Sequence, residues 1–276
     1  MKFTKMQAIG NDFIIIDLFS ENLPRPNETA PLLCDRHLGI GADGLILVGP
    51  SGTCDFSMRV INADGSEAEM CGNGIRCLAR YVVERGYTDK TEFVTESLRG
   101  PHSQRVSLDE GRFVDVTTYM GRPVLRRGLI PMLGEDAERV VGEPLAVDGV
   151  TYRITLVNVG NPHCVVFVDD VDAVDLPSVG PKFERHPLFP NRMNTEFVQV
   201  LDRNNLRMRV WERGVGETLA CGTGATASTV AAVLNGLTYN TVMVHLRGGD
   251  LIIEWRSGEE LYMTGGAQTV FTGEIR

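Results

Sequence analysis

Apolar and polar residues alternate in short runs along most of the chain, which is typical of β-strands with one buried face. In the first half these runs predict strands at 3–9, 13–17, 45–48, 56–60, 93–95, 105–108 and 113–116. In the second half they predict strands at 152–157, 164–168, 197–201, 206–210, 242–244, 251–254 and 261–263. Two segments show helical spacing instead: 75–83, which stops before Gly86, and 225–234, which stops before Gly236. The Pro-containing segment 23–31 is predicted as a loop.

The two halves repeat each other at an offset of 150 positions. Cys71-Gly72-Asn73-Gly74 recurs as Cys221-Gly222-Thr223-Gly224, and Gly10-Asn11 recurs as Gly160-Asn161. Between positions 58 and 74, seven of seventeen residues are identical to their partners at +150, where average residue usage gives about one by chance. A period this long indicates two domain-sized copies of one unit. Each copy is rich in strands with one principal helix, which favours a barrel or wrapped sheet around a central helix.

Composition narrows the classes of function. A chain of 276 residues is long for one core and comfortable for two domains. The net charge of −9 argues against nucleic acid or an anionic membrane as a partner, because both require a basic surface. No apolar run has membrane-spanning length, and the N-terminus runs directly into a strand pattern without a signal peptide. We therefore expect a cytoplasmic protein.

The chain has six cysteines, and two of them stand out. A disulfide framework does not suit a large intracellular chain, and structural zinc is disfavoured because no C-x-x-C occurs. We interpret four as small buried hydrophobic residues: Cys34, Cys54, Cys77 and Cys164. Only Cys71 and Cys221, in the duplicated motif, require another explanation.

A cysteine at a glycine-rich helix start suits carbon-acid chemistry. The partial positive charge at a helix N-terminus favours thiolate over thiol, and glycines allow exposed N–H groups to approach a carboxylate. Two such turns facing each other would hold one carboxylate and place a sulfur on each face of the adjacent carbon. This arrangement suits a reaction that removes a proton from one face and returns one to the other, with no cofactor and no metal.

Other chemistries fit the residues less well. A cysteine protease or amidase could pair His163 with one cysteine, but the second cysteine would be idle. Pyridoxal phosphate catalysis needs a Schiff-base lysine, and none of the four lysines lies in a glycine-rich motif. A non-enzymatic protein that binds a zwitterion would leave the thiol pair without a purpose.

Seven ordered sequence blocks resemble the diaminopimelate epimerase family over the whole length of the chain. They lie at 10–13, 36–43, 62–66, 69–77, 160–164, 191–197 and 211–224. The resemblance implies an α+β fold of two pseudosymmetric domains, each a β-sheet wrapped around a central α-helix. The expected N-terminal half is 1–119, completed by 265–276, and the expected C-terminal half is 120–264. The implied activity is interconversion of LL- and meso-diaminopimelate, in lysine and peptidoglycan precursor synthesis, by a homodimer.

The resemblance also implies roles for individual residues. Cys71 and Cys221 would be the two acid–base thiols, with His163 and Glu212 tuning their pKa values. The backbone amides of Gly72-Asn73 and Gly222-Thr223 would hold the reacting carboxylate, and Glu212 the reacting ammonium. The remaining substrate contacts would come from Asn11, Asn62, Asn161, Asn194 and Arg213.

One position departs from the family pattern. Many members carry glutamine where this chain has Gly44, so a side-chain contact is missing there. The related phenazine-synthesis isomerases share the fold but not the cysteine pair. Proline and hydroxyproline racemases share two opposed thiols and are the alternative assignment. They act on cyclic monocarboxylates, which would not need Arg213 and several asparagines for a distal zwitterion.

Overall fold

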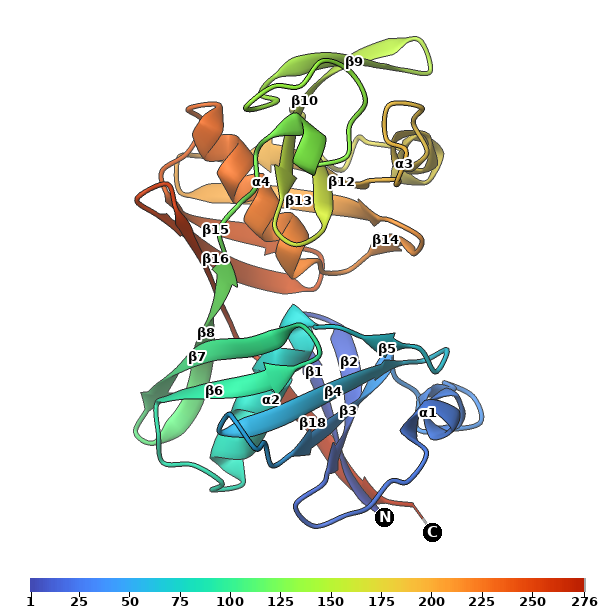
Figure 1. Ribbon diagram of the computed structural model, residues 1–276, viewed down its shortest axis with the longest axis vertical. Helices are drawn as coiled ribbons and strands as arrows, with labels where there is room; N and C mark the ends of the chain where they lie inside the picture. Colours follow the sequence, from blue (N-terminus) through green and yellow to red (C-terminus); the bar gives the residue numbers. More distant parts are fainter. Residues whose placement is uncertain (276) are drawn as a thin grey trace. The chain divides into compact units, whose positions relative to one another are not determined.

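The structure, a computed structural model, describes residues 1–275. The chain divides into two compact units. The first comprises Met1–Tyr119 and the segment from Thr264 onward, and the second comprises Met120–Met263. In each unit, strands surround one long helix, α2 (Gly72–Glu84) in the first and α4 (Gly222–Leu234) in the second (Figure 1).

In its described residues, the first unit has one mixed sheet and two helices. Its strands pair in the order β18-β1-β2-β3-β4-β6-β7-β8, with β5 added to β4, and the pairs β2/β3 and β4/β6 are parallel. A short helix, α1 (Pro26–Cys34), connects β2 to β3. The strands are β1 (Lys2–Ala8), β2 (Asn11–Asp17), β3 (Gly44–Gly49), β4 (Phe56–Asn62), β5 (Glu67–Ala68), β6 (Glu92–Ser97), β7 (Gly100–Asp109), β8 (Arg112–Gly121) and β18 (Gln268–Glu274).

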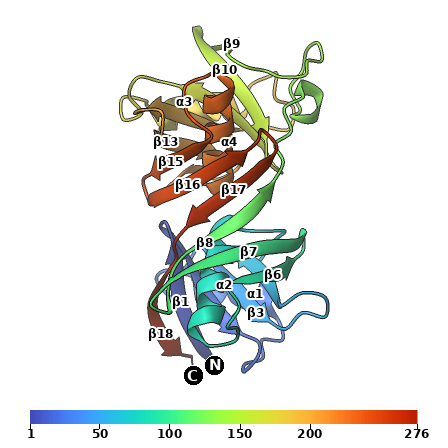
Figure 2. The same ribbon diagram turned by 90° about the vertical axis from the view of Figure 1, so that its left-hand side faces the viewer.

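The second unit repeats this order of pairing. Its strands run β9-β10-β11-β12-β13-β15-β16, with β14 added to β13, and the pairs β11/β12 and β13/β15 are parallel. Figure 2 shows β15, β16 and β17 on the same side of α4. A 3₁₀ turn, η1 (Arg127–Leu129), precedes β9, and α3 (Leu176–Glu184) connects β11 to β12. The strands are β9 (Glu143–Val147), β10 (Val150–Asn158), β11 (Pro162–Phe167), β12 (Asn194–Val200), β13 (Asn205–Glu212), β14 (Gly216–Thr218), β15 (Thr241–Leu246), β16 (Gly249–Arg256) and β17 (Glu260–Gly265).

The sequence repeat therefore extends to elements and to single contacts. The helices α1 and α2 recur as α3 and α4 at an offset of 150 residues at both ends. Arg59 contacts both carboxylate oxygens of Glu67, at 2.7 and 2.8 Å, and Arg209 contacts both of Glu217, at 2.9 and 3.3 Å. These paired ion bridges tie β4 to β5 and β13 to β14, the hairpins that lead into the two cysteine motifs.

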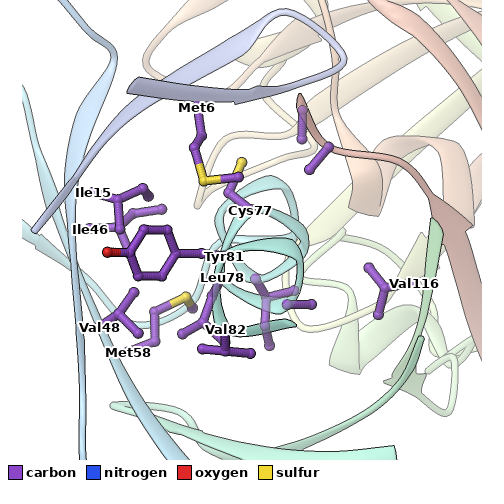
Figure 3. Close-up of a cluster of buried hydrophobic side chains, with 14 of the residues drawn as sticks. Met6, Ile15, Ile46, Val48, Met58, Cys77, Leu78, Tyr81, Val82 and Val116 are labelled. Carbon is purple, nitrogen blue, oxygen red and sulfur yellow. The ribbon is translucent and has the colours of Figure 1, made fainter. Parts of the chain in front are cut away.

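The first unit's core forms around α2. Apolar residues at helical spacing, including Ile75, Leu78 and Val82, are fully buried. Figure 3 shows Leu78 and Val82 among side chains from the surrounding strands, such as Met6 of β1 and Ile46 of β3. The second helix, α4, is instead rich in small residues that are buried on most of its surface. A helix that is buried on most of its surface is suited to enclosure by a sheet.

Both central helices end in the same way. Gly86 and Gly236 have a φ of +70°, the left-handed conformation that glycine adopts without strain. The next N–H groups, of Tyr87 and Leu237, donate back to the carbonyls of Val82 and Ala232 at 2.9 Å. This is the Schellman arrangement, and it confirms the two helix ends predicted from sequence.

The predicted fold class is confirmed: sheets wrap a central helix that starts at each cysteine motif. The predicted loop at 23–31 is wrong, because α1 occupies most of it. Pro26 stands in the first turn, where its missing N–H costs nothing, whereas Pro31 lies inside the helix. Burial of Ala30 and Cys34 overrides that unfavourable proline. The helix α3, which sequence analysis did not predict, also contains an interior proline, Pro181.

The prediction that four cysteines are buried is confirmed for three of them. Cys34, Cys77 and Cys164 are buried as predicted, but Cys54 is partly exposed, so its interpretation as a buried residue is wrong. Its main-chain N–H donates to the hydroxyl of Ser51 in a surface turn. Within residues 1–275, none of the helices has the length and apolarity required to cross a membrane.

Candidate functional site

In the first unit, Cys71 is the N-cap residue of α2. Its backbone is extended, and its Sγ accepts a hydrogen bond from the Gly74 N–H at 3.4 Å. The first N–H groups of a helix have no acceptor within the helix, so a side-chain acceptor stabilises the start. Sulfur replaces the usual oxygen in that role here. The helix start therefore holds the thiol in place and gives it a hydrogen-bond donor.

Two asparagine side chains lie beside this thiol. Asn73 Nδ2 donates to Asn11 Oδ1 at 3.0 Å, and Cys71 Sγ lies 3.9 Å from the same oxygen. Asn11 Nδ2 in turn donates to Asp43 Oδ2 at 2.8 Å. The side chain of Asn11 thus contacts both of the other predicted site residues, Cys71 and Asn73.

Asn62, at the end of β4, makes different contacts. Its Nδ2 donates to the hydroxyl of Ser66 at 2.9 Å, within the turn between β4 and β5. Asn62 pairs directly with Gly44 across the β3/β4 ladder. A Cβ at Gly44 would lie 2.9 Å from the Ile61 carbonyl oxygen, so a side chain there would require the backbone to move.

In the second unit, Cys221 is the N-cap of α4 with matching geometry. Its Sγ accepts from the Gly224 N–H at 3.4 Å and lies 3.5 Å from the hydroxyl of Thr223. Asn161 Nδ2 donates to that hydroxyl at 3.2 Å, as the equivalent Asn11 contacts Asn73 in the first unit. The two sites share one backbone design and differ in the side chains that surround the sulfur.

A buried histidine and glutamate lie behind Cys221. The Nδ1 atom of His163 lies 2.7 Å from Glu196 Oε1, and its Nε2 lies 3.0 Å from Asn161 Oδ1. Both the histidine and the glutamate side chains are fully buried. The three residues form a connected chain that reaches Thr223 and so the thiol. At the equivalent positions the first unit has Phe13 and Ile46, so it has no counterpart of this hydrogen-bonded pair.

Glu212, Asn194 and Arg213 complete the predicted residues of this unit. The Glu212 carboxylate accepts from the hydroxyl of Thr218 at 2.5 Å and is hydrogen-bonded to Cys221. Asn194 Oδ1 accepts from the Arg213 N–H at 2.9 Å, and Asn194 Nδ2 donates to the Pro162 carbonyl at 2.8 Å. Arg213 also donates from its guanidinium to the Asn191 carbonyl at 3.1 Å. Asn194 thereby fixes the backbone from which Arg213 extends.

The environment of Cys221 favours its protonated form. Burial raises the pKa of the Cys221 thiol well above its ordinary value, and the nearby charges of Glu212 and Glu196 raise it further. Burial likewise raises the pKa of Glu212, while hydrogen bonds from Thr218 and Cys221 oppose that rise. This half of the site is suited to holding a proton on sulfur.

Several residues in these networks were not predicted from the sequence. Glu196 lies inside the block 191–197 as an acidic residue within a buried strand, and that placement is the signal that could have revealed it. Arg76 likewise stands among the apolar positions of α2 and is fully buried. Within residues 1–275, no group of three or more His, Cys, Asp or Glu side chains is arranged to hold a metal ion.

Comparison with known proteins finds relatives that match nearly the whole length of the chain. The sequence profile described as diaminopimelate epimerase matches residues 3–126 and 155–270. The chain is 53% identical to the diaminopimelate epimerase of Pelotomaculum thermopropionicum over 277 residues, covering 99% of this chain and 98% of that protein.

Solved structures share the fold at low sequence identity. A Bacillus anthracis phenazine biosynthesis protein of the PhzF family matches with a TM-score of 0.70 and 15% identity, covering 100% of this chain and 99% of that chain. A probable proline racemase from Agrobacterium radiobacter K84 matches with a TM-score of 0.71 and 13% identity, covering 100% of this chain and 92% of that chain. At these identities the likeness concerns the fold.

Proposed function

Because the chain belongs to the diaminopimelate epimerase family, we propose that Cys71 and Cys221 are the two acid–base thiols with which it inverts an α-carbon. The protein is an isomerase, an epimerase of diaminopimelate, and its activity belongs to lysine biosynthesis. The observation that carries the assignment of the thiols is their equivalence. Each is the N-cap of its unit's central helix, and each accepts a first-turn N–H at 3.4 Å.

The proposed reaction moves one proton off the substrate and another onto it. One cysteine, as thiolate, removes the α-proton of LL-diaminopimelate and becomes a thiol. The electron pair of the broken C–H bond delocalises into the adjacent carboxylate. The other cysteine then donates its S–H proton to the opposite face, giving the meso isomer and a new thiolate. The roles exchange in the reverse direction.

The helix starts would stabilise the charge that develops on the carboxylate. The N–H groups of Gly72 and Asn73 in one unit, and of Gly222 and Thr223 in the other, belong to first turns, where helices leave donors unpaired. Donors fixed before the reaction begins stabilise an oxyanion without reorganisation, and removal of one such donor typically costs about 100-fold or more in rate. We propose that these four groups bind the reacting carboxylate from the two units.

The remaining predicted residues would recognise the rest of the substrate. Glu212 is suited to the reacting ammonium, since its carboxylate lies beside Cys221. Arg213 and Asn194, which contact each other, are suited to the distal carboxylate and its neighbouring groups. We assign Asn11, Asn62 and Asn161 to further polar contacts with the substrate. His163 would tune the thiol through Asn161 and Thr223.

We also propose that the two units correspond to the predicted halves of the family fold, 1–119 with 265–276 and 120–264. We further propose, as the family resemblance suggests, that the protein is a homodimer in the cytoplasm. Light scattering at concentrations well above and below one micromolar would test the dimer, and a monomer mass throughout that range would refute it.

The test of the proposed function is replacement of each thiol in turn. Cys71→Ala and Cys221→Ala should each abolish conversion of LL- to meso-diaminopimelate. Each substitution removes the only acid–base group on one face of the carbon. Wild-type turnover in either variant would refute the two-thiol scheme. Deuterium exchange from heavy water into diaminopimelate, compared with proline, tests the substrate. Exchange into proline alone would favour the racemase alternative.

A further inference from the structure

A fully buried arginine lies at the helix start that carries Cys71. Arg76 has no solvent-exposed surface and is among the largest fully buried side chains of the described residues. It lies on α2 between apolar residues, with Ile75 and Cys77 as sequence neighbours that are also fully buried. Burial of a cation is costly unless hydrogen bonds and a counter-charge accompany it.

The guanidinium is held by the turn that contains the thiol. It donates to the Gly72 carbonyl at 3.0 Å and to Asn73 Oδ1 at 2.7 Å, and Nε donates to the Gly266 carbonyl at 3.3 Å. Gly72 and Asn73 are the two residues that follow Cys71. The contacts therefore fix the cation against the same backbone that positions the sulfur.

The ionisable groups whose charges act on Arg76 include two sulfurs. Burial lowers the pKa of Arg76 to about 10, while the charges of Cys77 and Cys71 act to raise it. Arg76 therefore remains a cation at neutral pH. Burial raises the pKa of Cys77 to about 12, so that thiol remains protonated. Of the two sulfurs, Cys71 is the one suited to carry the counter-charge.

Other groups beside Cys71 act on its charge in both directions. The Gly74 N–H favours the thiolate, and Asn11 Oδ1, 3.9 Å from the sulfur, opposes it. Because a guanidinium only donates and a carboxylate only accepts, Arg76 and Asp43 together fix the orientation of both asparagine amides. The Asp43 carboxylate, itself bonded to Arg36, acts from beyond Asn11. A full buried charge outweighs the dipole of one neutral amide.

The second copy has no cation at the equivalent position. Thr226 stands there, and its hydroxyl donates to the Gly222 carbonyl at 2.8 Å, the counterpart of the bond from Arg76 to Gly72. The backbone contact is kept and the charge is lost. Cys221 is instead surrounded by the carboxylates of Glu212 and Glu196. The first cysteine turn thus holds a buried positive charge, whereas the charges that act on Cys221 are those of two carboxylates.

We propose that Arg76 is a positioning residue that makes Cys71 the thiolate of the free enzyme, so that the single proton of the pair resides on Cys221. The inference rests on the proposed function for the identity of the pair as acid–base groups. It adds that the two copies of the cysteine turn carry different charges. In the free enzyme, Cys71 of the first unit would therefore be the base that is ready to remove a proton.

The test measures how fast each thiol is alkylated by iodoacetamide between pH 5.5 and 9.5. Peptides containing Cys71 and Cys221 are quantified from the same digest by mass spectrometry. In the unmodified enzyme, the pH midpoint for Cys71 should lie below that for Cys221. In Arg76→Met, Cys71 should be alkylated about tenfold more slowly at pH 7, the change expected for one pKa unit. Cys221 in that variant should change by less than about twofold, since it lies outside this network.

Two further variants separate charge from folding. Arg76→Lys keeps the cation and should restore most of the reactivity of Cys71. Thr226→Val removes the matching carbonyl contact in the second copy without changing a charge, and should leave the midpoint of Cys221 in place. A lower midpoint for Cys221 than for Cys71 in the wild type would overturn the inference, even if Arg76→Met does not fold. An unchanged Cys71 profile in a folded Arg76→Met would also overturn it.

These results are independent of turnover. An active Cys71→Ala enzyme would refute the proposed function whatever the alkylation profiles are. Conversely, unchanged profiles in Arg76→Met would remove the role of Arg76 and leave the two-thiol reaction standing.

Discussion

Gly224→Ala is predicted to disturb the second cysteine turn, with Gly74→Ala as the matched control. The two glycines occupy equivalent positions in the first turns of α4 and α2. A Cβ at Gly224 would lie 2.8 Å from Glu196 Oε1 and 3.2 Å from Cys221 Sγ. A Cβ at Gly74 would lie 2.9 Å from the Cδ1 atom of Ile46 and 3.6 Å from Cys71 Sγ.

The two substitutions differ in whether the group that the new Cβ would meet can move aside. Ile46 Cδ1 is the far end of a flexible side chain, whereas the Glu196 carboxylate is fully buried and pinned by His163 at 2.7 Å. Crowding in a packed core costs about 1–3 kcal/mol, and replacing glycine by alanine in a helix returns up to about 1 kcal/mol. We expect Gly224→Ala to lower the free energy of unfolding by about 1–2 kcal/mol, and Gly74→Ala to change it by less than about 1 kcal/mol. For units of this size, 1 kcal/mol corresponds to about 2–4 °C in Tm.

The assay combines thermal unfolding with the rate of epimerisation. Because displacement of a catalytic group by a fraction of an ångström is costly, Gly224→Ala should also lose about tenfold or more in kcat, and Gly74→Ala less. The reasoning is refuted if Gly74→Ala is the more damaging substitution in both measurements. It is also refuted if Gly224→Ala retains the wild-type Tm and kcat.

Three further predictions concern stability and redox state. Arg209, nearly buried, donates to Glu217 and to the carbonyls of Val171 and Val174. Arg209→Met should therefore lower the free energy of unfolding, measured with urea, by about 3 kcal/mol. Arg59→Met, which breaks the half-exposed equivalent pair, should lower it by about 1 kcal/mol or less. Equal losses in the two variants would contradict the role of burial in this difference. Burial raises the pKa of Asp12, but hydrogen bonds from Arg36 and Lys5 outweigh burial and hold that pKa well below its ordinary value. The Asp12 carboxylate therefore stabilises the folded protein above about pH 4, and this stabilisation is lost as the pH falls through the folded pKa. Asp12→Asn should lower the free energy of unfolding by about 3 kcal/mol at pH 7 and by progressively less below about pH 4, and a pH-independent difference would count against this linkage. If the two thiols flank one carbon, air oxidation should inactivate the enzyme by forming a disulfide, and reductant should restore it; activity that reductant does not restore would argue against that proximity.

The sequence carried most of the information about the central helices and the strands around them. Apolar spacing along 75–83, the cysteine turn before it and Gly86 after it are local signals, and the structure follows them closely. The helix α1 was missed because the interior Pro31 is a strong local signal against a helix. The burial that stabilises α1 depends on contacts with distant strands, which local patterns do not show. The recurrence of the same proline at position 181 was the available hint that both segments share one structure.

The site was predictable in its residue types and less so in its contacts. The repeat and the family blocks identified the thiols and the asparagines, because these stand in recognisable sequence motifs. They did not reveal Arg76 or Glu196, since a charged residue among apolar positions only hints at burial, and the structure is needed to show that it is buried and what it contacts. The electrostatic difference between the two thiols emerges only from those buried groups.

The most direct test of the account is where solvent deuterium first appears during epimerisation in heavy water. With LL-diaminopimelate as substrate, the account predicts that early in the reaction the meso product carries deuterium at the inverted carbon. The LL substrate that remains should still carry protium, because the thiol that removes its proton is not the thiol that delivers the new one. Equal labelling of remaining substrate and product from the outset would contradict the account, since a single base serving both faces would produce it.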